Sequence, residues 1–389
     1  MKFVNGYFDW ASTSLPDKKI LENALKKSFD FSANPSSVHK KGIEAKTLLN
    51  NCRIRCAKIL DVKEDTIIFT SGGTESNCIP IVSLLQRPSK GSIVISAIEH
   101  PAIREQANAM KNSGWRVNIA KANKDGIITP EAVVNAMDKD TALVCVMAVN
   151  NETGAIQPIE EISKAISESS NGRKRPKFHV DAVQSIGKTL INLNYNGIDT
   201  VAISAHKLYG PRGVGILYMK NKFEPFLKGG GQEYGLRSGT ENIFGILALT
   251  ECLEKYCNNE FVNANIKKMT NVCNDFINEV LKIKGTSIVP PCREKIENTN
   301  SFFSPYILQV AFQNIPGEVM VRALSEKGFY ISTGSACSSK KQSRPILQAM
   351  QTPAEIALNS VRFSFSQDTT FEQTSALLDA LKSICSLFN

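Results

Sequence analysis

The chain has 389 residues, of which 42% are hydrophobic and 21% are charged, and these values are ordinary for folded globular proteins. At about 150 residues per domain, this length predicts two or three domains and excludes a small scaffold held together by disulfides. The 46 basic and 37 acidic residues give a formal net charge of +9. Because the basic residues are scattered, this charge favours anionic small ligands over nucleic acid.

The ten cysteines include no CxxC pair, so the sequence predicts neither a disulfide framework nor a metal site. The N-terminal residues lack the apolar stretch of a signal peptide. No run reaches the roughly 18 apolar residues that a membrane span needs. We therefore expect a cytoplasmic protein without a direct membrane or nucleic-acid partner.

Between Thr66 and about Met219 the sequence repeats short apolar runs, each followed by a polar turn and often by a helical pattern. Continuous apolar runs are typical of strands that are covered on both faces, and they predict a mostly parallel α/β sheet. Ligands of such sheets bind at the carboxyl ends of the strands. The predicted strands are Thr66–Thr70, Ser92–Ser96, Ala142–Val149, Lys177–Val180 and Thr200–Ser204.

Beyond Asn258 the pattern changes to an amphipathic helix that should reach about Lys284, followed by a break at Pro290 and Pro291. This change predicts a second, smaller domain. We expect a large domain over residues 15–258 and a small domain formed by residues 1–14 and 259–389.

A glycine-rich turn, Thr70–Asn77, follows the first predicted strand and opens a helix. Backbone N–H groups, hydroxyl groups and the helix N-terminus would together bind a phosphate there. Taken alone, the same turn could be an ordinary helix cap formed by Ser71 or Thr74.

Lys207 lies just past the strand that ends at Ser204, among small and hydroxyl-bearing residues. An amine in a partly dry, cationic pocket loses its proton more easily and can form a Schiff base with an aldehyde. Most lysines are solvated surface residues, but the position of Lys207 at a strand end favours a functional role.

Two further side chains follow strands of the same predicted sheet. Asp181 ends one strand, where a buried carboxylate could keep a pyridine nitrogen protonated, and His100 follows another, where it could stack on a flat ring. A phosphate-binding turn, a lysine, an aspartate and a histidine at successive strand ends together indicate pyridoxal phosphate.

Cys337 lies in a segment of small residues, Thr333–Lys341, which ends in two lysines. Nearby cations favour the thiolate, which is the reactive form of cysteine. A buried core cysteine would be inert, but the glycine and serine residues around Cys337 favour a reactive role.

Two segments resemble nucleotide-binding motifs, and each fails at one position. The run Gly229–Gly231 begins like a dinucleotide fingerprint, but Tyr234 stands where the third glycine belongs. The run Ala182–Thr189 ends like a P-loop, but Ala182 replaces its first glycine. A nucleotide-binding regulator would need saturable binding of ATP or NAD to regain support.

The chain as a whole resembles the cysteine desulfurases of the NifS/IscS type, which are class V aminotransferase relatives that depend on pyridoxal phosphate. The resemblance implies a homodimer with the type I, aspartate-aminotransferase-like fold: a large, mostly parallel-sheet domain and a smaller α/β C-terminal domain. It spans almost the whole chain and is carried by Asn34–His39, Thr70–Asn77, Glu99–His100, Asn150–Gly154, His179–Gln184, Ser204–Gly215, Arg237–Thr240 and Gly334–Ser339.

The resemblance also implies roles for individual residues. Lys207 would hold the cofactor covalently, His100 would stack on its ring, and Cys337 would accept sulfur. The other cofactor-binding residues would be Asp181 at the pyridine nitrogen, Gln184 at the phenolic oxygen, and Gly73, Thr74, Ser204, His206 and, from the neighbouring subunit, Thr240 at the phosphate. Asn151 would lie near both cofactor and substrate, and Arg362 would bind the substrate carboxylate.

The implied reaction converts L-cysteine to L-alanine and leaves a persulfide on Cys337. The persulfide would pass to an iron–sulfur scaffold protein or to a tRNA-thiolation protein. The alternatives are a selenocysteine lyase or a cystine C–S lyase of the same fold, and a non-catalytic binding protein built on that fold.

Overall fold

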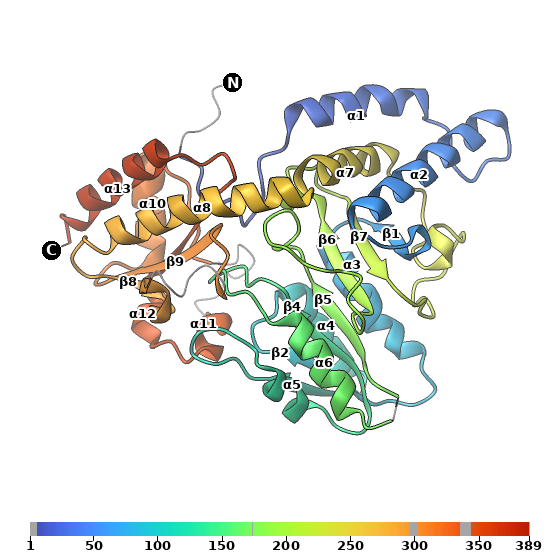
Figure 1. Ribbon diagram of the computed structural model, residues 1–389, viewed down its shortest axis with the longest axis horizontal. Helices are drawn as coiled ribbons and strands as arrows, with labels where there is room; N and C mark the ends of the chain where they lie inside the picture. Colours follow the sequence, from blue (N-terminus) through green and yellow to red (C-terminus); the bar gives the residue numbers. More distant parts are fainter. Residues whose placement is uncertain (1–5, 173, 296–301, 335–343, 389) are drawn as a thin grey trace.

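The structure is a computed structural model that describes residues 6–172, 174–295, 302–334 and 344–388 (Figure 1). Its larger sheet contains the strands β1 Ile67–Thr70, β2 Ser92–Ser96, β3 Arg116–Ala120, β4 Thr141–Met147, β5 Lys177–Asp181, β6 Thr200–Ser204 and β7 Gly215–Met219. The strand order is β1-β7-β6-β5-β4-β2-β3. Strand β7 runs antiparallel to β1 and β6, while the other strands share one direction. The predicted mostly parallel α/β sheet is confirmed.

Helices cover both faces of this sheet, and successive residues of a strand point to opposite faces. In β2, Ile93 and Ile95 lie in one apolar cluster, whereas Val94 between them lies in another. The double coverage explains why these strands read as continuous apolar runs. One face carries α3 Gly73–Val82 and α4 Pro101–Asn112, and the other carries α1 Lys18–Asp30, α2 Lys40–Ile59, α5 Pro130–Ala136, α6 Ile159–Ser169 and α7 Ile243–Tyr256.

Two strands of the large sheet were absent from the sequence-based prediction. Strand β3 lies at the sheet edge, and the polar residues Arg116, which is exposed, and Asn118, which is half-buried, interrupt its apolar run. Strand β7 follows β6 through a turn instead of a helix, so it does not fit the repeated pattern of strand, turn and helix. The predicted bounds of β2 and β6 are confirmed. Those of β1, β4 and β5 shift by one or two residues; β4 ends at Met147 and β5 includes Asp181.

The C-terminal part of the chain forms a second unit around a three-stranded antiparallel sheet. Its strands are β8 Thr286–Val289, β9 Ile307–Phe312 and β10 Ser360–Ser364, in the order β10-β9-β8. Helices α8 Asn259–Val280, α10 Gly317–Glu326 and α13 Phe371–Cys385 share its apolar core, which also contains Phe8 and Ala11 from the N-terminal segment. Helix α8 ends four residues before the predicted Lys284. The exact domain boundaries stay predictions.

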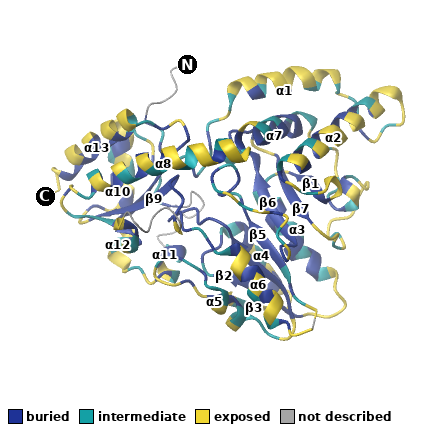
Figure 2. Cartoon of the chain, viewed as in Figure 1, coloured by how far each residue is buried: buried dark blue, intermediate teal, exposed yellow. Residues whose placement is uncertain are grey.

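Two short helices, α11 Pro345–Ala349 and α12 Ala354–Leu358, contribute Ile346 and Ala357 to the core of the larger unit. Figure 2 shows most strands of both sheets as buried, with the edge strand β3 as an exception, and the outer faces of α1, α8 and α13 as exposed. Within the described ranges, no helix combines the length and apolar character that a membrane crossing requires. The short 3-10 turns are η1 Glu64–Thr66, η2 Ser83–Gln86, η3 Ala205–Lys207, η4 Glu233–Gly235 and η5 Pro291–Glu294.

Candidate active site

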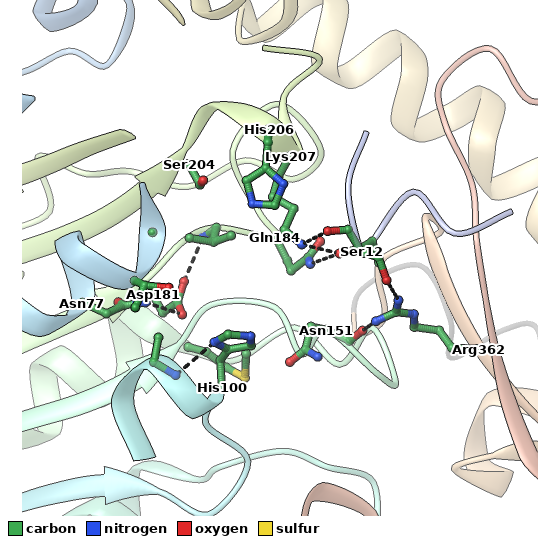
Figure 3. A pocket seen from close by; sticks show the side chains of 16 residues that line it. Ser12, Asn77, His100, Asn151, Asp181, Gln184, Ser204, His206, Lys207 and Arg362 are labelled. Atoms are coloured by element: carbon green, nitrogen blue, oxygen red, sulfur yellow. Dashed lines mark hydrogen bonds between the residues drawn. The ribbon is translucent and has the colours of Figure 1, made fainter. Parts of the chain in front are cut away.

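A pocket of about 230 Å³ lies at the carboxyl ends of the parallel strands and reaches β10 of the small sheet. Figure 3 shows His206 and Lys207 on one side of this pocket and His100 on the other, with Asp181 and Arg362 toward opposite ends. Because parallel strands end at a common sheet edge, residues far apart in the sequence meet here. The predicted site residues in the lining are Gly73, Thr74, His100, Asn151, Asp181, Gln184, Ser204, His206, Lys207 and Arg362.

Two predicted site residues are not part of this lining. Thr240 is exposed and lies outside the pocket, so its role toward a neighbouring subunit stays a prediction. Cys337 belongs to residues 335–343, which are outside the described part of the chain.

The first turn of α3 forms one end of the pocket. Its N-cap is Gly72, at φ 145°, and no side chain caps the helix, so the interpretation as an ordinary Ser71 or Thr74 cap is wrong. A Cβ at Gly73 would come within 2.8 Å of the Val183 side chain, which explains the glycine at this position. Ser204 lies next to Gly72 and Gly73, and the uncapped N–H groups of the turn can bind an anion.

The Lys207 side chain enters the pocket from η3, directly after β6. Its Nζ donates hydrogen bonds to the carbonyl oxygens of Ala11 at 2.6 Å and Ser12 at 2.7 Å. Burial, followed by the cationic charges of Arg362 and Lys188, lowers the pKa of Lys207 to about 7. A large part of the amine is therefore neutral at physiological pH, as a nucleophile or a base requires.

Asp181, at the end of β5, is held by a chain of buried hydrogen bonds. Its Oδ2 accepts from the Asn77 amide at 2.9 Å, and its Oδ1 accepts from the Val183 N–H at 3.0 Å. The Asn77 oxygen lies 2.8 Å from His179 Nε2, and His179 Nδ1 lies 2.8 Å from the Thr200 hydroxyl.

The direction of each bond in this chain follows from the charge state of His179. Burial lowers the pKa of His179 to about 3, so the ring is neutral and carries one proton. Asn77 donates to Asp181 through its amide, so its oxygen must accept, and the His179 proton is on Nε2. Thr200 then donates to Nδ1. Burial raises the pKa of Asp181, and the donor chain opposes this effect by stabilising the carboxylate.

Replacing Asn77 with leucine is expected to weaken the affinity of the cofactor-free protein for pyridoxal phosphate by about tenfold or more. Without its amide donor, Asp181 has a higher pKa, so a smaller fraction is ionised to partner a protonated ring nitrogen. Titration of the protein with cofactor, followed by visible absorbance, measures this affinity. The variant Thr200→Val breaks the chain two bonds further away and should have a smaller effect. Unchanged affinity in a folded Asn77→Leu protein would contradict a role for the chain.

His100 is both a pocket residue and the N-cap of α4. Its Nδ1 accepts a hydrogen bond from the Ala102 N–H at 3.1 Å. Burial, followed by the charge of Lys207, lowers the pKa of His100 to about 4, so the neutral ring carries its proton on Nε2. The adjacent Glu99 accepts from the Met147 N–H at 2.8 Å, which ties this turn to β4.

The opposite end of the pocket has polar atoms that are free for a ligand. Arg362, on β10, donates from Nη1 to the Asn151 carbonyl oxygen at 2.8 Å, whereas its buried Nε has no hydrogen-bond partner among the described residues. The Oδ1 of Asn151 and the Oε1 of Gln184 are also buried without a partner in the described part of the chain. Unsatisfied buried polar atoms are costly, so their convergence on one pocket indicates a polar ligand.

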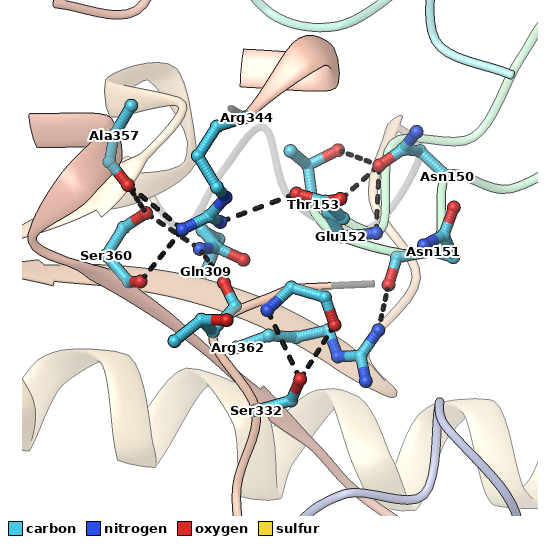
Figure 4. A network of polar contacts seen from close by, with 12 residues as sticks. Asn150, Asn151, Glu152, Thr153, Gln309, Ser332, Arg344, Ala357, Ser360 and Arg362 are labelled. Carbon is cyan, nitrogen blue, oxygen red and sulfur yellow. Dashed lines mark hydrogen bonds and ion pairs between the residues drawn. The ribbon is translucent and has the colours of Figure 1, made fainter. Parts of the chain in front are cut away.

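A polar network joins the loop after β4 to the small sheet (Figure 4). Arg344 Nη2 lies 3.4 Å from Glu152 Oε2, and Arg293 donates to the Thr153 carbonyl oxygen at 2.7 Å. A Cβ at Gly334 would come within 2.9 Å of the same Glu152 oxygen. The described residues that flank 335–343 therefore both lie against Glu152, next to the pocket residue Asn151.

Sequence reasoning gave no role to several residues that complete the site. Asn77 is the last residue of the glycine-rich segment Thr70–Asn77. Its spacing from Gly73 is a usable signal, because residues four positions apart share one face of a helix such as α3. Ala11 and Ser12 carry no local signal, because their partners are near residues 207 and 362 of the sequence.

With this geometry established, comparison with known proteins identifies the family. The aminotransferase class-V model matches residues 6–377. A NifS/IcsS protein homolog from Lactobacillus delbrueckii subsp. bulgaricus is 38% identical over 390 residues, which cover 98% of each chain. Cysteine desulfurase IscS of Dictyoglomus turgidum is 36% identical over 387 residues, covering 97% of this chain and 94% of that protein. A solved structure of a NifS-like protein has a TM-score of 0.88 at 32% identity, covering 98% of this chain and 99% of that one.

The chain belongs to the aminotransferase class-V family. The fold that the resemblance implied is confirmed, and enzymes of this family depend on pyridoxal phosphate. The pocket fits that cofactor, because it combines an amine of lowered pKa, a carboxylate with directed donors, an uncapped helix N-terminus and unsatisfied amide oxygens.

Proposed function

We propose that this chain is a pyridoxal-phosphate-dependent cysteine desulfurase, which converts L-cysteine to L-alanine and keeps the sulfur as a persulfide on Cys337. One observation carries the proposal: a single pocket holds the partly neutral amine of Lys207 and, further along, the guanidinium of Arg362. An amino-acid substrate needs a base for its Cα proton and a cation for its carboxylate. The relatives named cysteine desulfurases favour L-cysteine as that amino acid.

We assign the cofactor contacts as follows. Lys207 holds the cofactor covalently, Asp181 partners the ring nitrogen, His100 lies against the ring, and Gln184 lies at the phenolic oxygen. When bound, pyridoxal phosphate supplies an aldehyde for the substrate amine and a ring that stabilises negative charge at Cα. The phosphate contacts are assigned to Gly73, Thr74, Ser204 and His206, together with Thr240 of a second subunit.

Arg362 and Asn151 orient the substrate through its carboxylate. The guanidinium is fixed by the Asn151 carbonyl oxygen and keeps further N–H groups for a second acceptor. The Lys207 amine, when it is free, is held by two carbonyl oxygens and can accept the Cα proton in its neutral form. His100, with its proton on Nε2, presents a donor from the other side of the pocket.

The sulfur step uses the thiolate of Cys337, which attacks the sulfur of the bound cysteine. The substrate C–S bond breaks, the bond between the two sulfur atoms forms, and protons complete a persulfide on Cys337 and the methyl group of L-alanine. Formation of the sulfur–sulfur bond is a two-electron oxidation, and conversion of the substrate Cβ into a methyl group is a two-electron reduction. The reaction therefore needs no external oxidant or reductant.

The other cysteines support this assignment. All nine that the structure describes have their thiol pKa raised, and burial is the largest cause for each. They stay protonated at neutral pH, and a thiol is a poor nucleophile. Cys337 is outside the described residues, and its role rests on its flanking sequence and the family resemblance.

The alternatives have less support. The relatives are named for cysteine desulfuration, which favours this activity over a selenocysteine lyase or a cystine C–S lyase. A non-catalytic binding protein would not need an intact lysine, aspartate and histidine in one pocket.

The partners and location are part of the same proposal. We infer a homodimer, in which Thr240 reaches the neighbouring active site, and a cytoplasmic enzyme. Its persulfide sulfur passes to an iron–sulfur scaffold protein or a tRNA-thiolation protein. Residues 15–258 are taken as the large domain, and residues 1–14 with 259–389 as the small domain.

Product analysis tests the proposed function. The purified holoenzyme with L-cysteine and a thiol reductant should form L-alanine and sulfide in equal amounts. A cystine lyase acting by elimination would instead form pyruvate and ammonia from cystine. Pyruvate from cystine without L-alanine from L-cysteine would contradict the proposal.

A further inference from the structure

The N-terminal segment of residues 9–14 passes between Lys207 and Arg362, and two of its residues line the pocket. The sequence alone predicts only that these residues belong to the small domain. Figure 3 shows Ser12 between the Lys207 amine and the Arg362 guanidinium. The segment is therefore the piece of chain that joins the two functional ends of the site.

Asp9 and Ser12 hold one side of the Arg362 guanidinium. Nη2 of Arg362 donates to Asp9 Oδ1 at 2.7 Å and to Ser12 Oγ at 2.6 Å. The Ser12 hydroxyl in turn donates to Asp9 Oδ1 at 2.8 Å, which closes a triangle of polar contacts. The Arg362 side chain is 1% exposed and that of Asp9 is 21% exposed, so water screens this ion pair only partly.

The same segment holds the amine at the other functional position. The Ala11 carbonyl oxygen accepts from both Lys207 Nζ and Gln184 Nε2, the latter at 2.9 Å. The Ser12 carbonyl oxygen accepts from Lys207, while the Ser12 hydroxyl contacts Arg362. Ser12 thus contacts the Lys207 amine through its backbone and the Arg362 guanidinium through its side chain.

Backbone contacts anchor the segment at both ends, independently of the Asp9 side chain. The Ala11 N–H donates to the Ser364 hydroxyl at 2.9 Å, and the Ser364 N–H donates to the Phe8 carbonyl oxygen at 2.8 Å. At the other end, the Ser14 N–H donates to the His206 carbonyl oxygen at 2.8 Å. Changing the Asp9 side chain should therefore leave the path of the segment intact.

We propose that Asp9 is a positioning residue for Arg362: with Ser12, it orients the guanidinium so that the groups left free face the substrate carboxylate. The inference rests on the proposed function, because it takes Arg362 as the carboxylate-binding residue. An arginine side chain without a fixed partner would lose much of its conformational entropy when substrate binds. An arginine that is already held by other residues is preorganised for substrate binding.

Asp9 also acts on Lys207 through its charge. Burial and then the cations Arg362 and Lys188 lower the pKa of Lys207, and the carboxylates Asp9 and Asp181 oppose this by raising it. Removing the negative charge of Asp9 should therefore lower the pKa of the Lys207 amine further. This effect distinguishes a charged neighbour of the site from a residue that serves only to stabilise the fold.

Two substitutions at Asp9 separate its hydrogen bond to Arg362 from its negative charge. Asp9→Ala removes both the hydrogen-bond acceptor and the charge, and it should raise the KM for L-cysteine by about 10- to 100-fold, with kcat changed by less than about threefold. Asp9→Asn keeps an acceptor for Arg362, so KM should rise less. In the cofactor-free Asp9→Asn protein, the Lys207 amine should have a lower pKa. The pH at which pyridoxal phosphate uptake is half-maximal should therefore be lower than in the wild type. Asp379→Ala, at a carboxylate side chain that is 76% exposed on α13, is the matched control and should change neither quantity.

The possible outcomes distinguish a failure of the proposed desulfurase function from a failure of the positioning role of Asp9. If wild-type protein forms no L-alanine from L-cysteine, the proposed function fails, while the uptake midpoint still tests the position of Asp9. If wild-type protein is active and folded Asp9→Ala has the wild-type KM, the positioning role is wrong. A KM increase in Asp9→Asn as large as in Asp9→Ala would also overturn it, because the retained acceptor should preserve the orientation of Arg362.

Discussion

Lys207→Ala is expected to lower kcat/KM for L-cysteine by at least about 10³-fold, because the variant loses both the covalent attachment of the cofactor and the base near Cα. The wild-type amine has a pKa of about 7 and is held by two backbone carbonyl oxygens, so it is neutral in part and correctly placed. Alanine removes the Lys207 donor from the Ser12 carbonyl oxygen, while the Ala11 carbonyl oxygen keeps its bond from Gln184, and the pocket loses its nucleophile. Steady-state formation of L-alanine measures the loss.

Borohydride reduction locates the attachment without relying on activity. Reduced wild-type holoenzyme should carry the cofactor on the peptide that contains Lys207, and the Lys207→Ala protein should carry none. Lys188 is the matched control, since it is also a buried lysine with its pKa lowered, to about 8. The Lys188→Met protein should still be labelled at Lys207. Label on any other lysine in the wild type would refute the assignment.

Cys337→Ala is expected to reduce L-alanine formation from L-cysteine by at least about 10³-fold while leaving cofactor affinity unchanged. The substrate can still bind at Arg362 and lose its Cα proton, but its sulfur has no acceptor. Exchange of the Cα hydrogen with deuterated solvent should therefore persist, and nuclear magnetic resonance of the recovered cysteine detects it.

Cys292 provides the control for this substitution. It is partly exposed, and burial together with Asp125 raises its thiol pKa to about 12, so it stays protonated at neutral pH. Cys292→Ala should retain wild-type L-alanine formation. Full activity in Cys337→Ala, or loss of activity in Cys292→Ala alone, would show that sulfur is accepted elsewhere.

The sheet and most of the pocket could be predicted from the sequence because their signals are local. Apolar runs mark strands that are buried on both faces, and the polar residues at their ends, such as Asp181 and Lys207, meet at one edge for topological reasons. The exposed edge strand β3 lacks such a run, and antiparallel β7 follows a turn. Both were missed for that reason.

Contacts between distant parts of the chain could not be predicted in this way. Asp9 and Arg362 are 353 positions apart, and nothing in the local sequence of either indicates the other. The same holds for the hydrogen bonds from Asn77 through His179, whose directions depend on the burial of the imidazole ring. Such residues are recognised only once the fold places their atoms within hydrogen-bonding distance.

The most direct test is mass spectrometry of the holoenzyme after brief exposure to L-cysteine, followed by peptide mapping without reductant. The peptide that contains Cys337 should gain the mass of one sulfur atom, L-alanine should form in equal amount, and both signals should disappear in the Lys207→Ala protein. L-Alanine formation with the added sulfur on a different cysteine, or with no sulfur retained on the protein, would contradict the proposed sulfur transfer to Cys337.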